Sequence, residues 1–253
     1  MDWDVRVRDQ LRDFALASRA LTQPLALTGG DSHQYADLTF PSPGDNSPGV
    51  VNDLSFGHLP ATVPPRTSPY GDDWDVLWLG HCGMCFPRED SVSIPKGRII
   101  RHSDETVAAH RHLWSLSKPF ELVDKYPLHT RAYHHTQDGV CSLAYAVSQR
   151  GARRLLHEVG LKDVSEAFDI LLRFFCEGGR GRRSHLCLTT QPGLFHHHRP
   201  AGPHAAESDI SKHGDGWRDQ SVTDMVRWSV RLNADAIMDG ETVLHDQYPD
   251  SES

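Results

Sequence analysis

The sequence predicts an α/β fold. Val76 to Leu79 are four consecutive apolar residues, a run typical of a strand that is covered on both faces, although it also fits a buried turn of helix. Short apolar segments of this kind alternate along the chain with segments of helical periodicity. The 253 residues, 38% hydrophobic and 24% charged, suffice for a core of ordinary size. We expect one domain over residues 1–240 and a tail at 241–253.

A helix is expected over residues 4–22. An apolar series with helical spacing begins at Val7 and stops at Pro24. Asp2 and Asp4 place carboxylates where the start of a helix favours negative charge. An α/β domain normally enters such a helix from a strand, and no strand is expected here, so the fold is expected to be incomplete at its N-terminus.

Residues 25–73 are expected to form an irregular insertion. Half of the 16 prolines fall between Pro24 and Pro69, and they interrupt any periodicity. A loop of this length is typical of a lid, a binding loop or a family-specific insertion. A short strand is expected inside it, at Gly49 to Asn52.

The rest of the chain predicts further strands and helices. Ser148 is expected to cap one helix, and Ser221 with Asp224 to cap the last. The expected strands cover residues 98–102, 130–135, 140–147 and 185–189, with a turn at 137–139. The expected helices cover residues 150–159, stopped by Gly160, then 163–175, ended by Gly178-Gly179, and finally 221–232.

The charge and hydropathy of the chain argue against nucleic-acid binding and against a membrane span. The formal net charge of −8 makes a nucleic-acid backbone an improbable ligand. No run approaches the roughly 20 apolar residues that a membrane span needs, and no signal-peptide core precedes the first helix. A chain with this sequence is expected to stay in the cytosol.

Five cysteines, an odd number, do not predict a disulfide framework in a chain of this length. We expect all five to be structural thiols. Cys82 and Cys85 have the spacing of a redox or zinc half-site, and His196-His-His198 could add nitrogen ligands, so a zinc-binding protein is an alternative.

Several segments together resemble glycosyltransferase family 25, which includes bacterial lipooligosaccharide and animal procollagen galactosyltransferases, and most closely its fungal members. The segments are Asp2–Arg6 with the helix after it, Trp74–Cys82, Ala144–Ser148 followed by Arg150–Leu156, Asp169, and Gln191-Pro192 through Ser208–Ile210. The resemblance implies a GT-A type α/β fold and transfer of a galactose-like hexose from a nucleotide-diphosphate sugar to a glycan or protein hydroxyl. It also implies the secretory pathway, in the lumen of the endoplasmic reticulum or Golgi.

Family members carry further strands and an acidic metal motif ahead of the point where this chain begins. The resemblance therefore implies an N-terminally truncated member that lacks the donor-binding half. The apolar faces of the first helix and of Val76 to Leu79 are accordingly expected to be partly uncovered.

The chemistry implied by the resemblance needs Mn²⁺ or Mg²⁺ on the leaving diphosphate and a carboxylate that accepts the acceptor's proton. Asp169 aligns with a family aspartate and is the candidate base; the alternative is a polar helix position. The candidate metal ligands are Asp2, Asp4 and His197, although helix capping is the favoured reading of the two aspartates.

Three further residues are candidates for substrate binding. His81 follows the central apolar run and could contact donor or acceptor, or cap the strand. Tyr145 and Ser208 are carried over from the resemblance. A glycosyltransferase with this fold leads, and a catalytically silent binding module of the same fold is the alternative.

Overall fold

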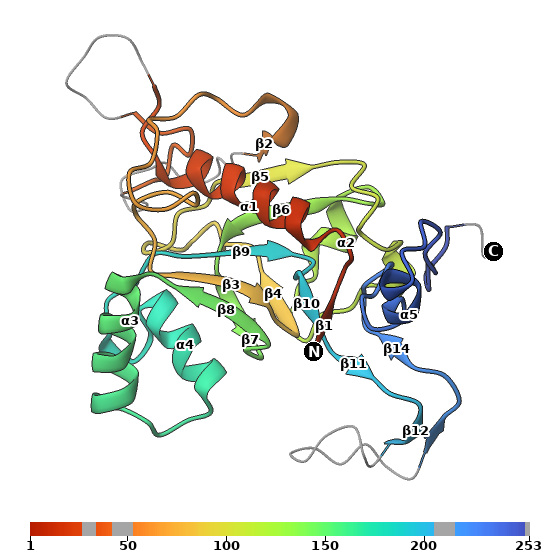
Figure 1. The fold of residues 1–253 in the computed structure, drawn as a ribbon. Helices are drawn as coiled ribbons and strands as arrows, with labels where there is room; N and C mark the ends of the chain where they lie inside the picture. The colour runs from red at the N-terminus through yellow and green to blue at the C-terminus, as the bar shows by residue number, and fades with distance from the viewer. Residues whose placement is uncertain (27–33, 42–52, 205–215, 251–253) are drawn as a thin grey trace.

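A computed structural model describes residues 1–26, 34–41, 53–204 and 216–250, which build a six-stranded mixed sheet with helices packed against it (Figure 1). The strand order is β2 (Asp53–Ser55), β5 (Arg98–Arg101), β6 (Arg131–His135), β9 (Cys187–Gln191), β3 (Val76–Gly80) and β8 (Ala144–Val147). The pairs β2–β5 and β3–β9 are parallel and the other three pairs are antiparallel. The α/β class predicted from the sequence is therefore confirmed.

The remaining elements are short, apart from two helices. The α-helices are α1 (Val7–Thr22), α2 (Glu121–Lys125), α3 (Gln149–Leu155), α4 (Phe168–Glu177) and α5 (Ala234–Met238), and a π-helix (Leu156–Lys162) follows α3. Short 3₁₀ turns lie at Phe56–His58, His110–His112 and Gly179–Gly181. Four two-stranded ribbons pair β1 (Asp2–Trp3) with β10 (Phe195–His196), β4 (Gly83–Cys85) with β7 (Gln137–Val140), β11 (His198–Arg199) with β14 (Val222–Thr223), and β12 (Gly202–Pro203) with β13 (Trp217–Arg218).

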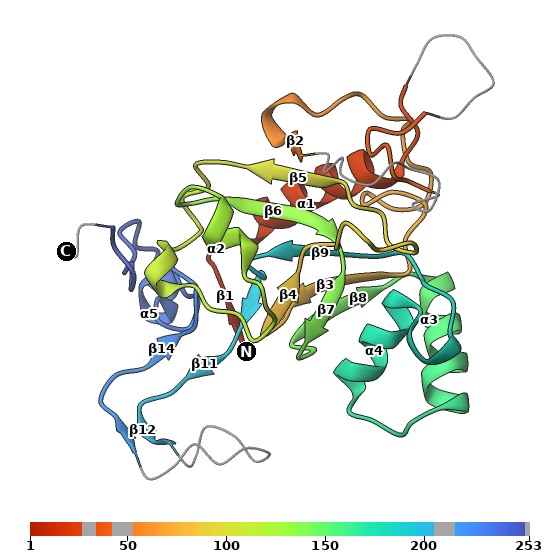
Figure 2. The same ribbon diagram turned by 180° about the vertical axis from the view of Figure 1, so that it is seen from behind.

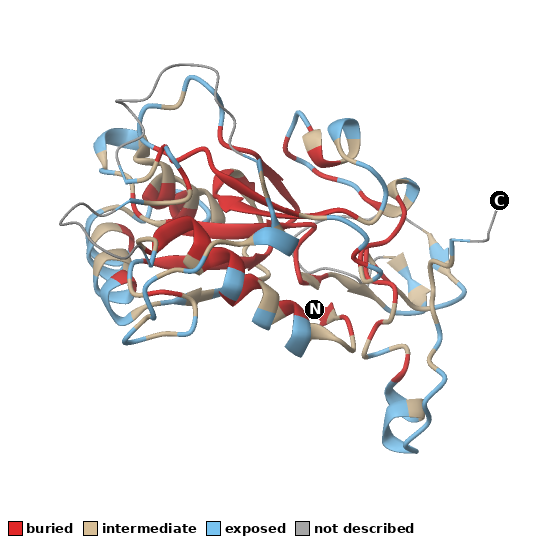
Figure 3. Ribbon diagram, turned by 90° about the horizontal axis from the view of Figure 1, so that it is seen from above, coloured by how far each residue is buried: buried red, intermediate tan, exposed pale blue. Residues whose placement is uncertain are grey.

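Strand β3 is buried along its whole length, as the apolar run predicts. Its side chains alternate between two hydrophobic clusters, which is the period of a strand. Leu77 packs in a cluster with Phe14 of α1, and Trp78 packs in a second cluster with Phe175 of α4. Helix α1 lies in front of the sheet in Figure 1 and behind it in Figure 2, and the buried residues concentrate around the strands in Figure 3.

Helix α1 is covered within this chain, so the expectation of uncovered apolar faces is wrong. Phe14 and Leu21 are each 1% exposed, and Val76 is fully buried. A strand does precede the helix, because Asp2 and Trp3 pair antiparallel with Phe195 and His196. The helix begins at Val7 rather than at residue 4.

The segment at 137–147 differs from the expectation. Gln137–Val140 is strand β7 rather than a turn, and it pairs with β4 across a register shift. Cys141 has a positive φ of 62°, which ends β7, and the chain then enters β8 at Ala144. The backbone conformation of one residue therefore divides the predicted strand at 140–147 into two.

The predicted cap at Ser148 is confirmed, because its Oγ accepts a hydrogen bond of 2.9 Å from the Gly151 amide. Gly160 does not stop the helix, which continues as the π-helix to Lys162. Helix α4 begins at Phe168, later than predicted, and ends at Gly178, whose φ of +82° is the left-handed conformation that glycine favours.

The predicted closing helix at 221–232 is wrong. Ser221 Oγ accepts a hydrogen bond from the Ala201 amide, and Asp224 pairs with Arg199, so neither side chain caps a helix. The segment begins as β14, and helix α5 starts later, at Ala234.

Residues 241–250, predicted as a tail, fold back on this region. The His245 amide donates to Asn233 Oδ1 at 2.6 Å, and the Tyr248 ring stacks on His112 at 4.3 Å between centroids. The strand predicted at Gly49 to Asn52 lies outside the described residues. In the described ranges, no helix has both the length and the apolar character needed to cross a bilayer.

Replacing Phe14 by alanine tests the covered face of α1. Phe14→Ala should lower the free energy of unfolding by about 3–5 kcal/mol, because it opens a cavity in the core. Leu16→Ala is the matched control: Leu16 is 42% exposed on the same helix, and its loss should change stability by about 0.5 kcal/mol or less. Urea denaturation followed by tryptophan fluorescence measures both. Similar small losses in the two variants would contradict the burial of Phe14 in the core.

Candidate functional site

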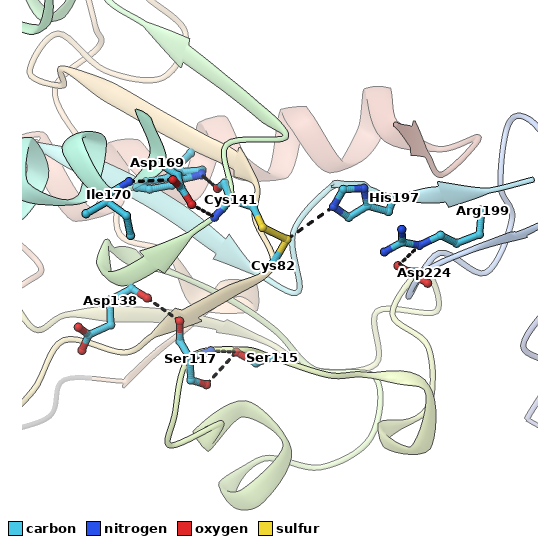
Figure 4. Close-up of a disulfide and its surroundings, with 11 residues drawn as sticks. Cys82, Ser115, Ser117, Asp138, Cys141, Asp169, Ile170, His197, Arg199 and Asp224 are labelled. Carbon is cyan, nitrogen blue, oxygen red and sulfur yellow. Dashed lines mark hydrogen bonds and ion pairs between the residues drawn. A yellow bond between two sulfur atoms is a disulfide. The ribbon is translucent and has the colours of Figure 1, made fainter. Parts of the chain in front are cut away.

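The loop after β3 carries a disulfide between Cys82 and Cys141 (Figure 4). The Cα atoms of the two residues are 5.3 Å apart. His197 lies beside this disulfide, with its Nε2 3.7 Å from Cys82 Sγ. The site therefore combines segments that are far apart in the sequence, at the carboxyl end of a buried strand where ligands commonly bind in α/β folds.

Backbone hydrogen bonds fix the Cys82 segment independently of the disulfide. The Cys82 amide donates to Val140 O at 2.8 Å, and the Leu116 amide donates to Cys82 O at 2.9 Å. Gly83 packs so closely on the Ser117 backbone that an added Cβ would lie 2.4 Å from Ser117 N, so only glycine fits. The position of Cys82 is thus set by its surroundings.

Asp169, the candidate base, stands at the first turn of α4 and is half-buried. Its Oδ2 accepts a hydrogen bond of 2.8 Å from the Cys141 amide, and its Oδ1 accepts one of 3.0 Å from the Ile170 amide (Figure 4). The start of a helix also favours a carboxylate. Asp169 therefore joins α4 to the disulfide segment, a role that neither sequence interpretation included.

Tyr145, on the edge strand β8, packs against the residue that precedes Asp169. Its ring forms a tilted pair with Phe168, 5.4 Å between centroids, and Phe168 directly precedes Asp169. The two aromatic residues are 42% and 37% exposed. An exposed aromatic pair offers an apolar face to a ligand, and the tyrosine hydroxyl adds a polar group.

The three consecutive histidines point to different partners. His196 is buried and its Nε2 donates to Gly193 O at 2.8 Å. His198 Nδ1 lies 3.0 Å from Thr223 Oγ1. Of the three, His197 is the one that approaches the disulfide, and its carbonyl oxygen accepts a hydrogen bond from the Asp224 amide.

His81 is 5% exposed and faces the interior. Its Nε2 donates to Thr190 O at 2.9 Å, on the neighbouring strand β9. Burial lowers the pKa of His81 to about 4, although this hydrogen bond opposes the shift. Burial also lowers the pKa of His134 and that of His196. The neutral imidazole of His81 thus connects the residue that follows β3 to strand β9.

Asp2 and Asp4 occupy separate, buried positions at the N-terminus. Asp2 accepts hydrogen bonds from the hydroxyls of Thr223 and Ser229 and is fully buried. Asp4 Oδ1 accepts from the Arg6 amide at 2.8 Å, and its pKa is raised, first of all by burial. Neither forms the predicted cap: the N-cap position is Arg6, which makes no side-chain capping bond.

The predicted ligands Asp2, Asp4 and His197 do not converge on a common point. Within the described residues, the one group of three side chains whose ligand atoms lie within 4.8 Å of one another is Cys82, Cys141 and His197. Mn²⁺ and Mg²⁺ prefer oxygen ligands, which this group lacks, so these residues do not fit either ion. Ser208 lies outside the described residues.

The expectation of five structural thiols is wrong for four of them. Besides Cys82–Cys141, a second disulfide joins Cys176 of α4 to Cys187 of β9. Cys85 is the free thiol, and its pKa is raised to about 11, mainly by burial. The Cys-x-x-Cys spacing is therefore incidental, because its two members point to different partners, and disulfide connectivity is not readable from sequence.

A cavity of about 370 Å³ opens near the other end of β3. Arg150 and Arg154 line it and pair with the buried Asp75 at 3.2 and 2.9 Å. Burial raises the pKa of Asp75, but hydrogen bonds from His185 and the Leu186 amide, with the two arginines, outweigh it and lower the pKa to about 2. These charged groups satisfy one another, so they act to hold α3 on the sheet.

Comparison with known proteins finds no matching family model, no matching curated protein and no matching solved structure.

Acidification should destabilise the fold through its buried histidines. The pKa of His81 is about 4 when folded and about 6.5 when unfolded, so the unfolded chain binds more protons between these values. The contribution of His81 is complete above pH 6.5 and is lost as the pH falls towards 4. His81→Gln should flatten this dependence, whereas His58→Gln, at an exposed position, should not.

Urea midpoints measured from pH 7 to pH 4 test this expectation. Equal slopes in the wild type and His81→Gln would show that His81 does not contribute.

Proposed function

We propose that this chain is a glycosyltransferase-type protein that binds and transfers a hexose at a surface site formed by Tyr145, Phe168 and Asp169. The observation that carries the proposal is that the half-buried Asp169 directly follows Phe168, one member of an exposed aromatic pair with Tyr145. The C–H face of a hexose is apolar and can stack on the aromatic pair. Its hydroxyls are hydrogen-bond donors and can bond to the Asp169 carboxylate. The mixed α/β sheet is compatible with a GT-A type domain. We include membership of glycosyltransferase family 25 in the proposal.

In the proposed reaction, Asp169 is the general base. The acceptor hydroxyl oxygen attacks the anomeric carbon of a nucleotide-diphosphate hexose, the bond from that carbon to the diphosphate breaks, and the hydroxyl proton passes to Asp169. The amides of Cys141 and Ile170 hold the two carboxylate oxygens in place. A fixed carboxylate loses less entropy on reaching the reactive geometry.

A second function has its own supporting observation. Asp2 and Asp4 are buried and do not meet His197, and the one metal-type cluster in the described ranges contains no carboxylate. A module that binds hexose without transferring it would need no such cation. Titration of UDP-galactose with and without Mn²⁺ separates the two: cation-dependent donor binding favours the transferase, and binding of the acceptor sugar alone favours the silent module.

The two disulfides support an oxidising compartment as part of this proposal. The lumen of the endoplasmic reticulum or Golgi would provide it, and glycan or protein acceptors are met there. Partners of nucleic-acid type remain outside the proposal because of the net charge of −8.

Asp169→Asn tests the base directly. The substitution removes the proton acceptor and should lower hexose transfer from UDP-galactose or UDP-glucose at least about 100-fold. Asp235→Asn is the matched control, because Asp235 is an exposed acid in the first turn of another helix, α5. UDP release and thermal unfolding are measured together. A transfer rate that is unchanged in a folded Asp169→Asn protein would eliminate Asp169 as the base.

Tyr145→Ala tests the aromatic face. Loss of the ring should weaken binding of a hexose-bearing acceptor about 10-fold, the equivalent of about 1.4 kcal/mol. Tyr145→Phe keeps the ring and should retain the affinity of the wild type. Isothermal titration with a galactoside measures each dissociation constant. The aromatic-face hypothesis fails if the alanine variant binds as well as the phenylalanine variant.

A further inference from the structure

The geometry around the Cys82–Cys141 disulfide points to a second chemical state. We propose that reduction of this disulfide creates a zinc site, with Cys82, Cys141 and His197 as its protein ligands and a water molecule in the fourth position. The three ligand atoms take no part in the proposed glycosyl transfer, so the two proposals can be tested separately, although the hydrogen bond from the Cys141 amide to Asp169 is common to both.

The spacing of the candidate ligands matches zinc. Zn–S bonds are about 2.3 Å and Zn–N bonds about 2.0–2.1 Å, so a tetrahedral ion places a sulfur and a nitrogen ligand about 3.6 Å apart. The observed separation of Cys82 Sγ and His197 Nε2 is 3.7 Å. All three ligand atoms lie within 4.8 Å of one another. The His197–Cys82 pair therefore already has the spacing of two ligands to one ion.

The sulfurs must move apart, and the backbone allows it. Two thiolates on one tetrahedral zinc lie about 3.8 Å apart, beyond the length of a disulfide bond. Because the Cα atoms are 5.3 Å apart, side-chain rotation can provide this separation. Rotation of the two side chains would therefore suffice, with the backbone of both segments in place.

Each ligand has a backbone anchor that survives reduction. Cys82 is held by Val140 O and the Leu116 amide, Cys141 by Asp169 Oδ2, and His197 by the Asp224 amide. None of these bonds involves a sulfur atom. The ligand set is therefore preorganised without the disulfide, which favours metal capture over collapse of the loop.

The chemical balance is simple. A dithiol reductant transfers two electrons and two protons to the disulfide, giving two thiols and its own disulfide. Zinc then replaces the two thiol protons, which are released to water, and binds the neutral imidazole nitrogen of His197. Cys141 and His197 are half-buried, so solvent can supply the fourth ligand, as in zinc sites that keep one position open.

The second disulfide provides an internal control. Cys176 and Cys187 also form a disulfide, but in the described ranges no histidine or carboxylate completes a group of three with their sulfurs. Reduction of that disulfide should generate thiols without a comparable zinc site. The free Cys85 is equally outside the cluster.

The test compares the oxidised and the reduced protein. Each is exposed to zinc, with a phosphine reductant in the reduced sample because it does not compete for metal as a dithiol does, then desalted and analysed for bound metal. Reduced wild type should retain one zinc per chain, and the oxidised chain none. The reduced Cys176→Ser/Cys187→Ser variant should still bind one zinc. Cys141→Ser should bind none, and His197→Ala should bind at least about 10-fold more weakly.

Cobalt provides a readout that does not depend on variants. Reduced wild type loaded with Co²⁺ should show the intense sulfur-to-metal absorption of a tetrahedral thiolate site, and oxidised wild type should not. The proposal is overturned if reduced wild type binds no metal, if it unfolds on reduction, or if Cys176→Ser/Cys187→Ser abolishes binding while Cys141→Ser preserves it.

Discussion

The covering of strand β3 on both faces is the constraint on which the rest of the fold depends. Alternate side chains of Val76–Gly80 enter two separate clusters, one shared with α1 and one with α4. A strand that is buried in this way needs neighbours on both edges, and β8 and β9 provide them. Gly151 lets α3 approach the residue that leads into β3, because an added Cβ would lie 2.1 Å from Asp75 O. The loop after β3 is consequently held at a fixed place, and the candidate site is built on it.

The elements that could be predicted from sequence are those governed by local rules. The buried run at Val76 to Leu79, the Ser148 cap and the glycine end of α4 each depend on neighbouring residues, and the structure confirms all three. The segment at 221–232 has helical periodicity but forms β14 and turns, because its polar side chains bond to Ala201 and Arg199 instead of capping a helix. Tertiary contacts override local pattern there.

The candidate site was predictable only in part, for the same reason. Asp169, Tyr145 and His197 were candidates, but Asp169 and His197 are linked through the Cys82–Cys141 disulfide, a pairing that no spacing rule identifies. His81 was expected either to contact a substrate or to cap the strand, and in the structure it forms an interior hydrogen bond to Thr190 O. These pairings join residues from 28 to 115 positions apart, and a local sequence pattern does not record them.

The buried Asp2 carboxylate has a consequence for the order of folding. It accepts a hydrogen bond from Ser229, which is 227 positions further along the chain, and β1 pairs with β10 at a comparable distance. Contacts of such long range require large loops to close, which slows folding. During synthesis, Asp2 cannot reach this native partner until Ser229 has been made. Helix α1 and β3 can form early, but β1 should pair with β10 and Asp2 should bond to Ser229 last, so that these partners stay unpaired in a newly made chain.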